Sequence, residues 1–277
     1  MPHTPTDRHA GDAAPLRFLV VSASYQCARW VARSLHSVQT QTYPHFRHVL
    51  VDDCSTDGTA EAARQAVAGD ARFEVLVNSD RRFPLANIVR AVAAVGGGPD
   101  DVLVVLDGDD WLKHPKVFEH LAAVYRDPAV WMTYGSHELL KRGRKARLLR
   151  RQVLGKCYPY PEVVSELGAY RYYDFIAQHL RTSRRFLWEA IRDEDLRDDD
   201  GGYYRAAADV ATMIPMLEMA TPAHWRHLDE VLHVYNNQHT LSENRPGSRS
   251  EQLRVSMLVR AKPRYAPLQR ATTGATP

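Results

Sequence analysis

Short apolar segments alternate with amphipathic helical segments in about the first 110 residues, and this alternation constrains the fold more than any other feature. Four short apolar runs predict strands, and the first of them, β-branched and without polar alternation, has the pattern of a strand buried on both faces. Apolar residues at helical spacing predict a helix between each pair of strands. The predicted strands are residues 16–23, 48–51, 73–77 and 102–106, and the predicted helices are 28–41, 60–67 and 85–95. Strands and helices in this order form a mainly parallel sheet with right-handed crossovers, so we predict an α/β fold with helices flanking the sheet.

Polar residues follow three of the four predicted strands. Ser24 and Tyr25 follow the first strand, Asp52 and Asp53 follow the second, and residues 107–110 (DGDD) follow the fourth. Ligands of open parallel sheets bind beyond the carboxyl ends of the strands. We therefore expect these residues to lie on one rim of the sheet, and their common position is a stronger signal than any single motif.

The DGDD segment brings several carboxylates to the end of one strand, with Gly108 permitting close approach. Neighbouring carboxylates raise each other's pKa unless a cation compensates their charge. Mg²⁺ or Mn²⁺ is typically held by one or two carboxylates and completes its shell with water and substrate phosphates. A capped turn with surface aspartates is the alternative, but the position at a strand end favours a metal site.

Asp52 and Asp53 have two interpretations of equal weight. A carboxylate at this position can accept hydrogen bonds from a nucleotide base or from ribose hydroxyls. Alternatively, residues 52–59 (DDCSTDGT) only form a turn and cap the next helix. The motif alone does not decide between these interpretations.

Composition limits the class of protein only weakly. The chain has 36 Lys and Arg against 33 Asp and Glu, and the resulting net charge of +3 neither requires nor excludes a nucleic-acid or membrane partner. Cys27, Cys54 and Cys157 lack the spacing of a zinc site or a disulfide framework, which favours a reducing, cytoplasmic location. No run approaches the roughly 18 apolar residues that span a bilayer, although peripheral membrane contact stays open.

The second half of the chain is less regular and more polar. A helix should begin near Pro115, and helical patterns also cover residues 204–220 and 250–259. Later strands are predicted at 129–134, 223–227 and 231–235. Residues 141–151 (KRGRKARLLRR) form a basic segment that we expect to be a loop.

Four segments together are similar to the ordered sequence blocks of family 2 glycosyltransferases. They are residues 20–25 (VVSASY), 34–43 (SLHSVQTQTY), 51–59 (VDDCSTDGT) and 106–112 (LDGDDWL). The resemblance implies a GT-A fold, which is a Rossmann-like nucleotide-diphospho-sugar transferase fold, a nucleotide-sugar donor and inversion at the anomeric carbon. The polar first fifteen residues predict a disordered leader (1–15), and the resemblance divides the remainder into a nucleotide-sugar-binding half (16–125), an acceptor-binding half (126–245) and a C-terminal helix and tail (246–277).

The resemblance implies roles for the residues of these blocks. Ser24 and Tyr25 would lie beside the nucleotide, and Asp52 or Asp53 would bind the base. Asp109 would be the principal ligand of Mn²⁺ or Mg²⁺. Asp107 would be shared between metal and ribose, with Gly108 beside the donor.

Two departures from the family pattern concern the donor. Gln26 and Cys27 follow Tyr25, where relatives often have Asn. Residues 81–84 (RRFP) replace a glycine-containing segment, and either Arg81 or Arg82 could pair with the diphosphate; Arg82 is our candidate.

Inverting transfer needs a carboxylate that removes the proton of the acceptor hydroxyl. Relatives place it in a Glu-Asp pair that leads a helix, and the best match is Asp209, which follows Ala208 in place of Glu. Asp209 stands among Ala, Val and Met residues, which makes a merely solvent-facing role harder to explain.

Two further segments are weaker candidates. Residues 179–182 (HLRT) resemble a block of a bacterial and viral branch of the family, which places Arg181 near the diphosphate; a basic surface face is the alternative. His239 follows a late strand, where relatives often carry a histidine that completes the metal shell. A polar turn is the competing interpretation of His239.

Competing functions were weighed on the same residues. A phosphatase of the haloacid dehalogenase type needs its nucleophilic aspartate after the first strand, where this chain has residues 22–25 (SASY). A non-catalytic nucleotide-sugar-binding protein would lack a functional Asp209. The donor is expected to be a UDP-sugar. The acceptor stays open between a glycan, a protein, a small molecule and a hydroxymethylated base in DNA. The basic segment is consistent with DNA, because positive charge binds a polyanion.

Overall fold

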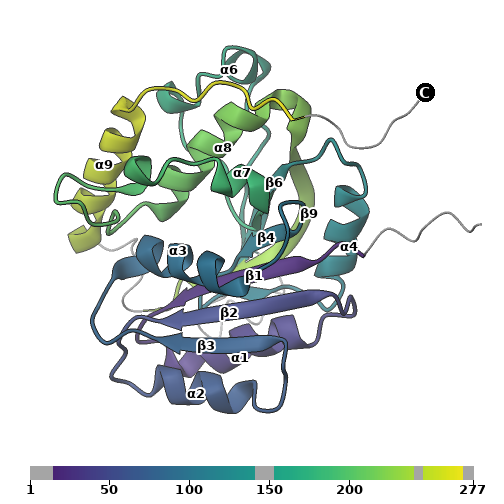
Figure 1. Cartoon of the computed structure of the whole chain (residues 1–277), viewed down its shortest axis with the longest axis vertical. Helices are drawn as coiled ribbons and strands as arrows, with labels where there is room; N and C mark the ends of the chain where they lie inside the picture. The colour runs from purple at the N-terminus through teal and green to yellow at the C-terminus, as the bar shows by residue number, and fades with distance from the viewer. Residues whose placement is uncertain (1–14, 141–152, 240–245, 271–277) are drawn as a thin grey trace, which may run out of the picture.

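The computed structural model describes residues 15–140, 153–239 and 246–270 of the chain, and these form one mixed sheet covered by helices (Figure 1). The strands follow the order β3-β2-β1-β4-β8-β6-β9-β5, and β7 pairs with β6. Their bounds are β1 (Phe18–Ser24), β2 (Phe46–Asp52), β3 (Phe73–Val77), β4 (Val102–Val105), β5 (Trp111–Leu112), β6 (Met132–Leu139), β7 (Val153–Gly155), β8 (Arg181–Arg184) and β9 (Trp225–Tyr235). The predicted leader and basic segment lie, but for Pro15, outside the described residues.

The helices lie on both faces of this sheet. They are α1 (Ala28–Gln39), α2 (Thr59–Ala66), α3 (Phe83–Val95), α4 (Val117–Tyr125), α6 (Glu162–Glu166), α7 (Arg185–Glu189), α8 (Ala208–His224) and α9 (Pro246–Ala261). Two short 3₁₀ turns, η1 (Tyr170–Tyr172) and η2 (Asp193–Leu196), connect them. Figure 1 shows α3 on one face of β1 and β2, and α1 with α2 on the other.

The first half of the sheet confirms the predicted alternation. Strands β3, β2, β1 and β4 are parallel neighbours, with Ser24 paired to Asp52 in the register of β1 and β2. Pairing continues beyond the strands, because Asp53 N–H donates to Ser24 O over 2.8 Å and Gly108 N–H donates to Ala23 O over 2.9 Å. The three polar clusters therefore share one rim, as the sequence predicts.

Strands β1, β2 and β4 are buried on both faces, which explains their largely apolar sequences, whereas β3 at the edge of the sheet is only partly buried. Leu19 and Val21 of β1 pack with α3, whereas Phe18 and Val20 pack on the opposite face against Phe118 of α4. Each of these side chains is fully buried. Burying a large aliphatic or aromatic side chain contributes about 1.5–3 kcal/mol, so this half of the sheet is a rigid support for its rim.

Strand β8 enters the sheet antiparallel between β4 and β6, and the sequence analysis did not predict it. Its sequence is RTSR, yet all four residues are buried. Thr182 Oγ1 is hydrogen-bonded to Tyr125 Oη at 2.8 Å and to Thr133 Oγ1 at 2.6 Å. The guanidinium of Arg184 donates to the carbonyls of Val130 and Tyr125. These partners satisfy polar groups that would otherwise make burial costly.

Two predictions for the second half need correction. The strands predicted at 223–227 and 231–235 are replaced by one strand, β9, which begins at Trp225 directly after α8. Its centre carries the exposed Asp229 and Glu230 and so resembles a loop in sequence. Helix α8 begins at Ala208 rather than at residue 204, because Ala207 has a φ of 52° that is incompatible with the helix. Asp209 therefore lies in the first turn of α8.

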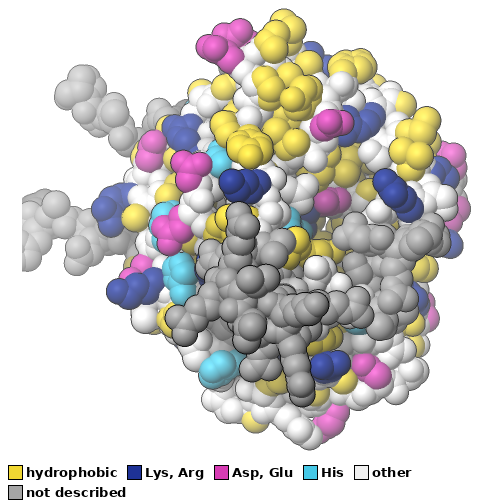
Figure 2. All heavy atoms as spheres, turned by 180° about the vertical axis from the view of Figure 1, so that it is seen from behind, with side chains coloured by type: hydrophobic (Ala, Val, Ile, Leu, Met, Phe, Trp, Pro, Cys, Tyr) yellow, Lys and Arg dark blue, Asp and Glu magenta, His cyan; other side chains and the backbone are white. Residues whose placement is uncertain are grey.

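Exposed apolar side chains gather at one end of the molecule. Tyr158, Val163, Leu167 and Tyr172 are all more than half exposed. Figure 2 shows apolar side chains gathered at the upper end of the molecule, where Figure 1 places α6. Among the described residues, none of the helices has the length and apolar character needed to cross a bilayer.

Candidate active site

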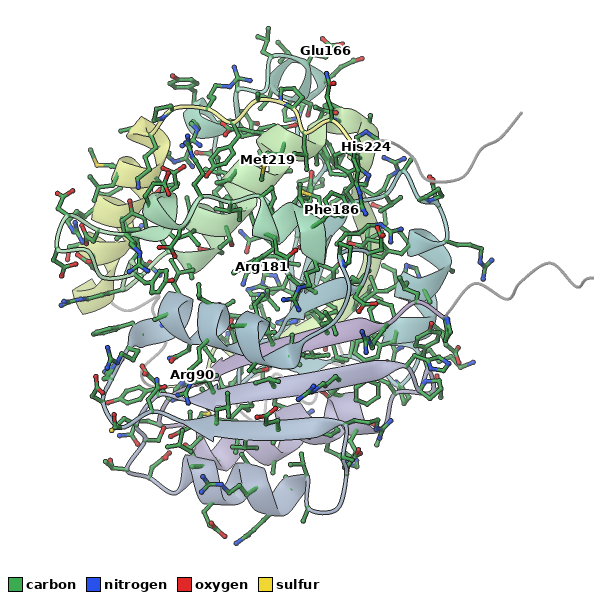
Figure 3. The ribbon with its side chains drawn as sticks, in the orientation of Figure 1. Arg90, Glu166, Arg181, Phe186, Met219 and His224 are labelled. Carbon is green, nitrogen blue, oxygen red and sulfur yellow. The ribbon has the colours of Figure 1, made fainter. Side chains whose placement is uncertain are left out.

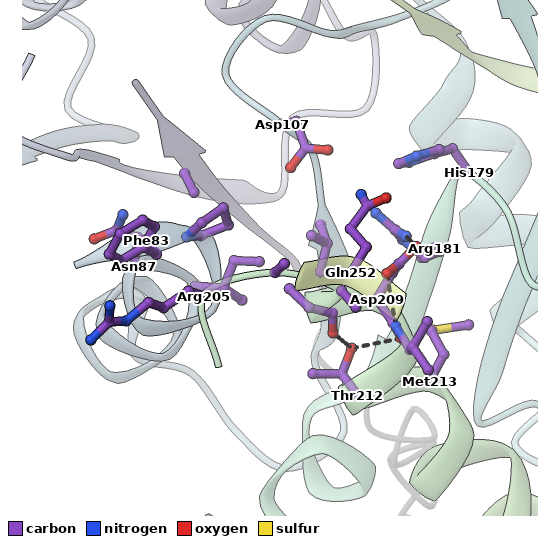
Figure 4. A pocket seen from close by; sticks show the side chains of 18 of the residues that line it. Phe83, Asn87, Asp107, His179, Arg181, Arg205, Asp209, Thr212, Met213 and Gln252 are labelled. Atoms are coloured by element: carbon purple, nitrogen blue, oxygen red, sulfur yellow. Dashed lines mark hydrogen bonds and ion pairs between the residues drawn. The ribbon is translucent and has the colours of Figure 1, made fainter. Parts of the chain in front are cut away.

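A cavity of about 1190 Å³ opens at the rim of the sheet, between the ends of β1 and β4, the start of β8 and the first turn of α8 (Figure 4). It brings together most of the residues singled out from the sequence. Those that line it are Ser24, Tyr25, Asp53, Asp107, Asp109, Arg181, Asp209 and His239. Asp52, Arg82 and Gly108 lie outside this lining.

Asp107 is a carboxylate that the fold makes difficult to ionise. Its pKa is raised to about 7, mainly by burial and also by the negative charges of Asp110 and Asp109, while Arg181 acts in the opposite direction. A buried carboxylate near two others is stabilised in its ionised form by a cation. The position therefore has the electrostatic character that the sequence predicts for a metal site.

Gly108 has a packing role in the turn after β4. A Cβ atom at this position would stand 2.5 Å from the Cβ of Ser24 and 3.1 Å from the carbonyl oxygen of Ala23. Any side chain would force the turn away from the end of β1. Gly108 thus sets how closely the carboxylates approach Ser24, and no side chain of its own reaches the cavity.

His239 lies directly beside Asp109. Its Nδ1 is 3.0 Å from Asp109 Oδ2, and its Nε2 is 2.9 Å from the carbonyl oxygen of Gln26. The hydrogen bond to Asp109 raises the pKa of His239. The structure thus brings two of the three predicted metal ligands, Asp109 and His239, into contact although they are far apart in the sequence.

Asp110 is bound to the chain itself and does not face the cavity. It is buried, and its carboxylate accepts hydrogen bonds from the backbone N–H of Asn236 over 2.7 Å and from His233 Nε2 over 2.9 Å. These bonds join the turn after β4 to the end of β9. Because Asn236 precedes His239 by three residues, Asp110 helps to fix His239 beside Asp109.

Arg181 occupies the centre of the molecule, as Figure 3 shows. Antiparallel pairing opposes Arg181 at the start of β8 to Val105 at the end of β4, so its side chain reaches the same rim as Asp107. Its Nη1 is 3.1 Å from Asp209 Oδ2. Asp209 Oδ1 accepts the N–H of Val210 over 2.8 Å, and the carboxylate is one-third exposed, which leaves it accessible from the cavity.

The loop between β3 and α3 is fixed by Asp53. The Asp53 carboxylate accepts the N–H groups of Arg82 and Phe83 over 2.7 and 2.9 Å, and the side-chain amide of Asn78 over 2.9 Å. Asp53 lines the cavity, but these three bonds already use much of its accepting capacity. Asp52 is fully buried, accepts Ser55 N–H over 3.0 Å and belongs to the turn.

The two arginines of this loop point to different places. The guanidinium of Arg81 lies 3.7 Å from the centre of the Tyr25 ring and lines the cavity. Arg82 instead pairs with Asp80 at 2.7 Å, and its side chain is 61% exposed. Of the two candidates for a diphosphate contact, the structure therefore brings Arg81 to the cavity and not Arg82.

The sequence analysis missed a group of buried histidines behind the rim. Asp110, His179 and His233 have ligand atoms within 4.8 Å of one another. The rings of His179 and His233 are stacked, with centroids 4.5 Å apart and planes 14° apart. Their in-plane lone pairs run nearly parallel and do not converge on one ion. A histidine facing Asp110 from β9 carries no motif, so only the strand pairing reveals it.

Comparison with known proteins gives one family. The model of glycosyl transferase family 2 matches residues 19–178, more than half of the chain. Over 102 residues, 37% of this chain and 39% of the relative, the chain is 30% identical to TuaG of Bacillus subtilis strain 168, named as a teichuronic acid biosynthesis glycosyltransferase. It is 31% identical to the glycosyltransferase EpsE of the same organism over 105 residues, 38% of this chain and 36% of EpsE. The matches thus span about two-fifths of each curated relative.

Solved structures with the same fold cover most of the chain. TarS of S. aureus, residues 1–349 in complex with UDP-GlcNAc, superimposes with a TM-score of 0.62 at 17% identity, covering 88% of this chain and 65% of that one. The mannosyltransferase PcManGT of Pyrobaculum calidifontis, in complex with GDP-Man and Mn²⁺, gives a TM-score of 0.58 at 18% identity, covering 94% and 70%. The predicted GT-A fold is confirmed.

Proposed function

This chain belongs to glycosyl transferase family 2, and we propose that it is a metal-dependent, inverting glycosyltransferase that transfers a sugar from a UDP-sugar to an acceptor hydroxyl. One observation carries the proposal. Asp209 shares a single cavity with Asp107 and Asp109, and Arg181 lies between the two groups. A base for the acceptor and carboxylates for the donor are both needed for this chemistry, and here they face one space.

The donor set supports a divalent cation. Asp107, Asp109 and His239 would hold Mn²⁺ or Mg²⁺, since carboxylate oxygens and imidazole are ligands that such ions accept. The raised pKa of Asp107 supports the same assignment, because its burial among other carboxylates disfavours its charge without a cation. When bound, the ion would neutralise charge on the leaving diphosphate.

The remaining steps fall to side chains of the chain itself. Asp209 would accept the proton of the acceptor hydroxyl while that oxygen forms a bond to the anomeric carbon from the face opposite the diphosphate. The bond between the anomeric carbon and the diphosphate oxygen then breaks, and its electron pair leaves with the nucleoside diphosphate. Arg181 holds the Asp209 carboxylate in place and contributes positive charge beside the leaving group.

The donor base and the location are finer parts of the proposal. A UDP-sugar is supported by family resemblance and by the UDP-GlcNAc complex of the structural neighbour TarS, whereas PcManGT was solved with GDP-Man. Both donors therefore belong in the test. A cytoplasmic location continues to rest on the unpaired cysteine pattern of the sequence.

The test is mass spectrometry of the purified chain incubated with UDP- and GDP-sugars in the presence of Mn²⁺. We expect slow release of free sugar and nucleoside diphosphate from one donor class. Asp209→Asn should reduce transfer by about 10²–10⁴-fold once an acceptor is supplied, and should leave UDP affinity nearly unchanged. Asp199→Asn, an exposed aspartate of the preceding loop, is the matched control. Failure to bind or hydrolyse any donor would contradict the proposal, and full transfer by Asp209→Asn would reject the assigned base.

A further inference from the structure

A second cavity of about 790 Å³ adjoins the first. Four residues, Arg81, Phe83, Asn87 and Arg205, line both cavities and form the wall between them. Figure 4 shows Phe83, Asn87 and Arg205 grouped on the side of the main cavity away from Arg181 and His179. A substrate that enters the main cavity from this side would therefore extend into the second one.

Five arginines line this second cavity, together with a single carboxylate, that of Asp80. They come from three segments: the loop before α3, helix α3 itself and the segment after η2. The five are Arg81, Arg82, Arg90, Arg197 and Arg205. A concave surface lined by charge of one sign focuses the electrostatic field and attracts the opposite charge.

Three of the five arginines are compensated by nearby carboxylates. Arg82 pairs with Asp80 at 2.7 Å, Arg197 pairs with Asp193, and Arg205 pairs with Asp200 at 3.2 Å. Since these pairs are largely exposed, each guanidinium keeps N–H donors that can turn to a ligand. The three pairs alone would not give the cavity a strong preference for anions.

Arg90 and Arg81 carry the excess positive charge. Arg90 donates to the side-chain oxygen of Asn78 and to the carbonyl of Val77 over 3.3 Å, and neither acceptor is charged. The nearest carboxylate oxygen to Arg81 belongs to Asp53 and is 3.7 Å away, on a group that already accepts three hydrogen bonds. Within the described part of the chain, these two guanidinium groups thus face the cavity with incompletely compensated charge.

We propose that the second cavity binds a phosphate group carried by the sugar acceptor. This inference rests on the proposed glycosyl transfer and narrows its acceptor class. Asp107, Asp109, His239 and Arg181 already account for the donor diphosphate in the main cavity, so the arginines that line only the second cavity, Arg90 among them, are available for another anion. Guanidinium groups match phosphate oxygens in pairs, and an acceptor anchored here extends past Phe83 and Arg205 toward Asp209.

The experiment compares a hexose 6-phosphate with the unphosphorylated hexose. Both are titrated against the full chain saturated with UDP and Mn²⁺, so that the diphosphate subsite is filled before the probe is added. We expect the phosphorylated sugar to bind at least about tenfold more tightly, with an affinity that falls as salt is raised. Arg90→Gln should remove about tenfold of that affinity, and Arg90→Lys should restore part of it.

Control measurements separate this inference from the proposed function. Arg64→Gln removes an exposed arginine of α2 that lines neither cavity and should change nothing. UDP affinity should be the same in all variants. Equal binding of the two probes, or an Arg90→Gln variant that binds like wild type, would overturn the phosphate site. Weaker UDP binding in Arg90→Gln would assign the cavity to the donor instead, and failure of the wild type to bind UDP would count against the glycosyltransferase proposal itself.

Discussion

The guanidinium of Arg181 lies 3.1 Å from the carboxylate of Asp209 and also lowers the pKa of the buried Asp107. The guanidinium of Arg181 therefore acts on both the proposed base and the proposed donor site. Its position is set by backbone pairing, because Arg181 is opposite Val105 in the register of β8 and β4. The pairing of β8 with β4 thus fixes the positive charge of Arg181 close to both Asp107 and Asp209.

Removing this charge should impair the donor side as well as the base. In Arg181→Gln the pKa of Asp107 should rise further, because a positive charge that lowers it is lost. We expect kcat with a nucleotide sugar to fall by about 10²-fold or more, and Arg181→Lys to retain part of the activity. Steady-state kinetics with direct UDP titrations would measure both effects. Unchanged turnover in Arg181→Gln would show that the ion pair has no part in transfer.

The turn after β4 should tolerate no side chain at Gly108. In Gly108→Ala the new Cβ would meet the Ser24 Cβ at 2.5 Å, so either the turn or β1 must shift. We expect a loss of about 1–3 kcal/mol in the free energy of unfolding, measured with urea, together with weaker Mn²⁺ binding. Gly98→Ala is the control, since its Cβ would have only the Asp101 carboxylate nearby, at 4.0 Å. Equal stability of the two variants would contradict the packing role of Gly108.

A substitution at Asp109 should weaken metal binding without destabilising the fold. Asp109→Asn removes a charge that faces the cavity and His239, so Mn²⁺ affinity should fall by about tenfold or more while the unfolding midpoint changes little. Asp110→Asn is the informative comparison, because Asp110 is buried and bonded to Asn236 and His233. Asp110→Asn should lower the unfolding midpoint more than Asp109→Asn does. Titration calorimetry with Mn²⁺ and thermal unfolding, with and without a chelator, test the distinction, and the reverse pattern would refute it.

Acid should destabilise the fold through a buried histidine far from the proposed metal ligands. Burial lowers the pKa of His48 from 6.5 to about 3, so the folded chain holds it neutral. The unfolded chain binds this proton below pH 6.5, and stability is therefore complete above that pH and is lost as the pH falls toward 3. The loss is about 1.4 kcal/mol per pH unit for each such histidine.

His48→Gln should make this pH dependence shallower by about one proton. Urea unfolding at a series of pH values between about 7.5 and 5 measures the slope directly. His137 and His233 are held neutral in the same way, with pKa values lowered to about 4 and about 3, so part of the slope should persist. A variant with the wild-type slope would show that His48 is already neutral in the unfolded chain or protonated in the fold.

The first half of the sheet was predictable because its strands are short, largely apolar runs separated by helical patterns. Residues 73–77 are strand β3 as predicted, and the other three parallel strands differ only at their ends. Strand β8 could not be predicted in this way. Its buried side chains are polar, and their partners, such as Tyr125 and Thr133 for Thr182, are distant in sequence.

The residues of the candidate site also fall into a predicted group and a group that could not be predicted. The grouping of Asp107, Asp109 and Ser24 follows from strand ends and was predicted. The preference for Arg81 over Arg82 was not, because it depends on how Asp53 draws the backbone of the β3–α3 loop inward through the N–H groups of Arg82 and Phe83. The periodicity and spacing of residues in a sequence do not predict the direction of a side chain within a loop.

The antiparallel entry of β8 between β4 and β6 has a consequence for how such a chain can diversify. The residues proposed for chemistry lie on strand ends and on the first turn of α8, whereas the wall of the second cavity comes from the β3–α3 loop and the segment after η2. Neither connection takes part in the strand pairing that places Arg181 opposite Val105. On the proposed phosphate site, substitutions in these two connections would alter acceptor preference while leaving the strand ends that carry the proposed transfer residues in place.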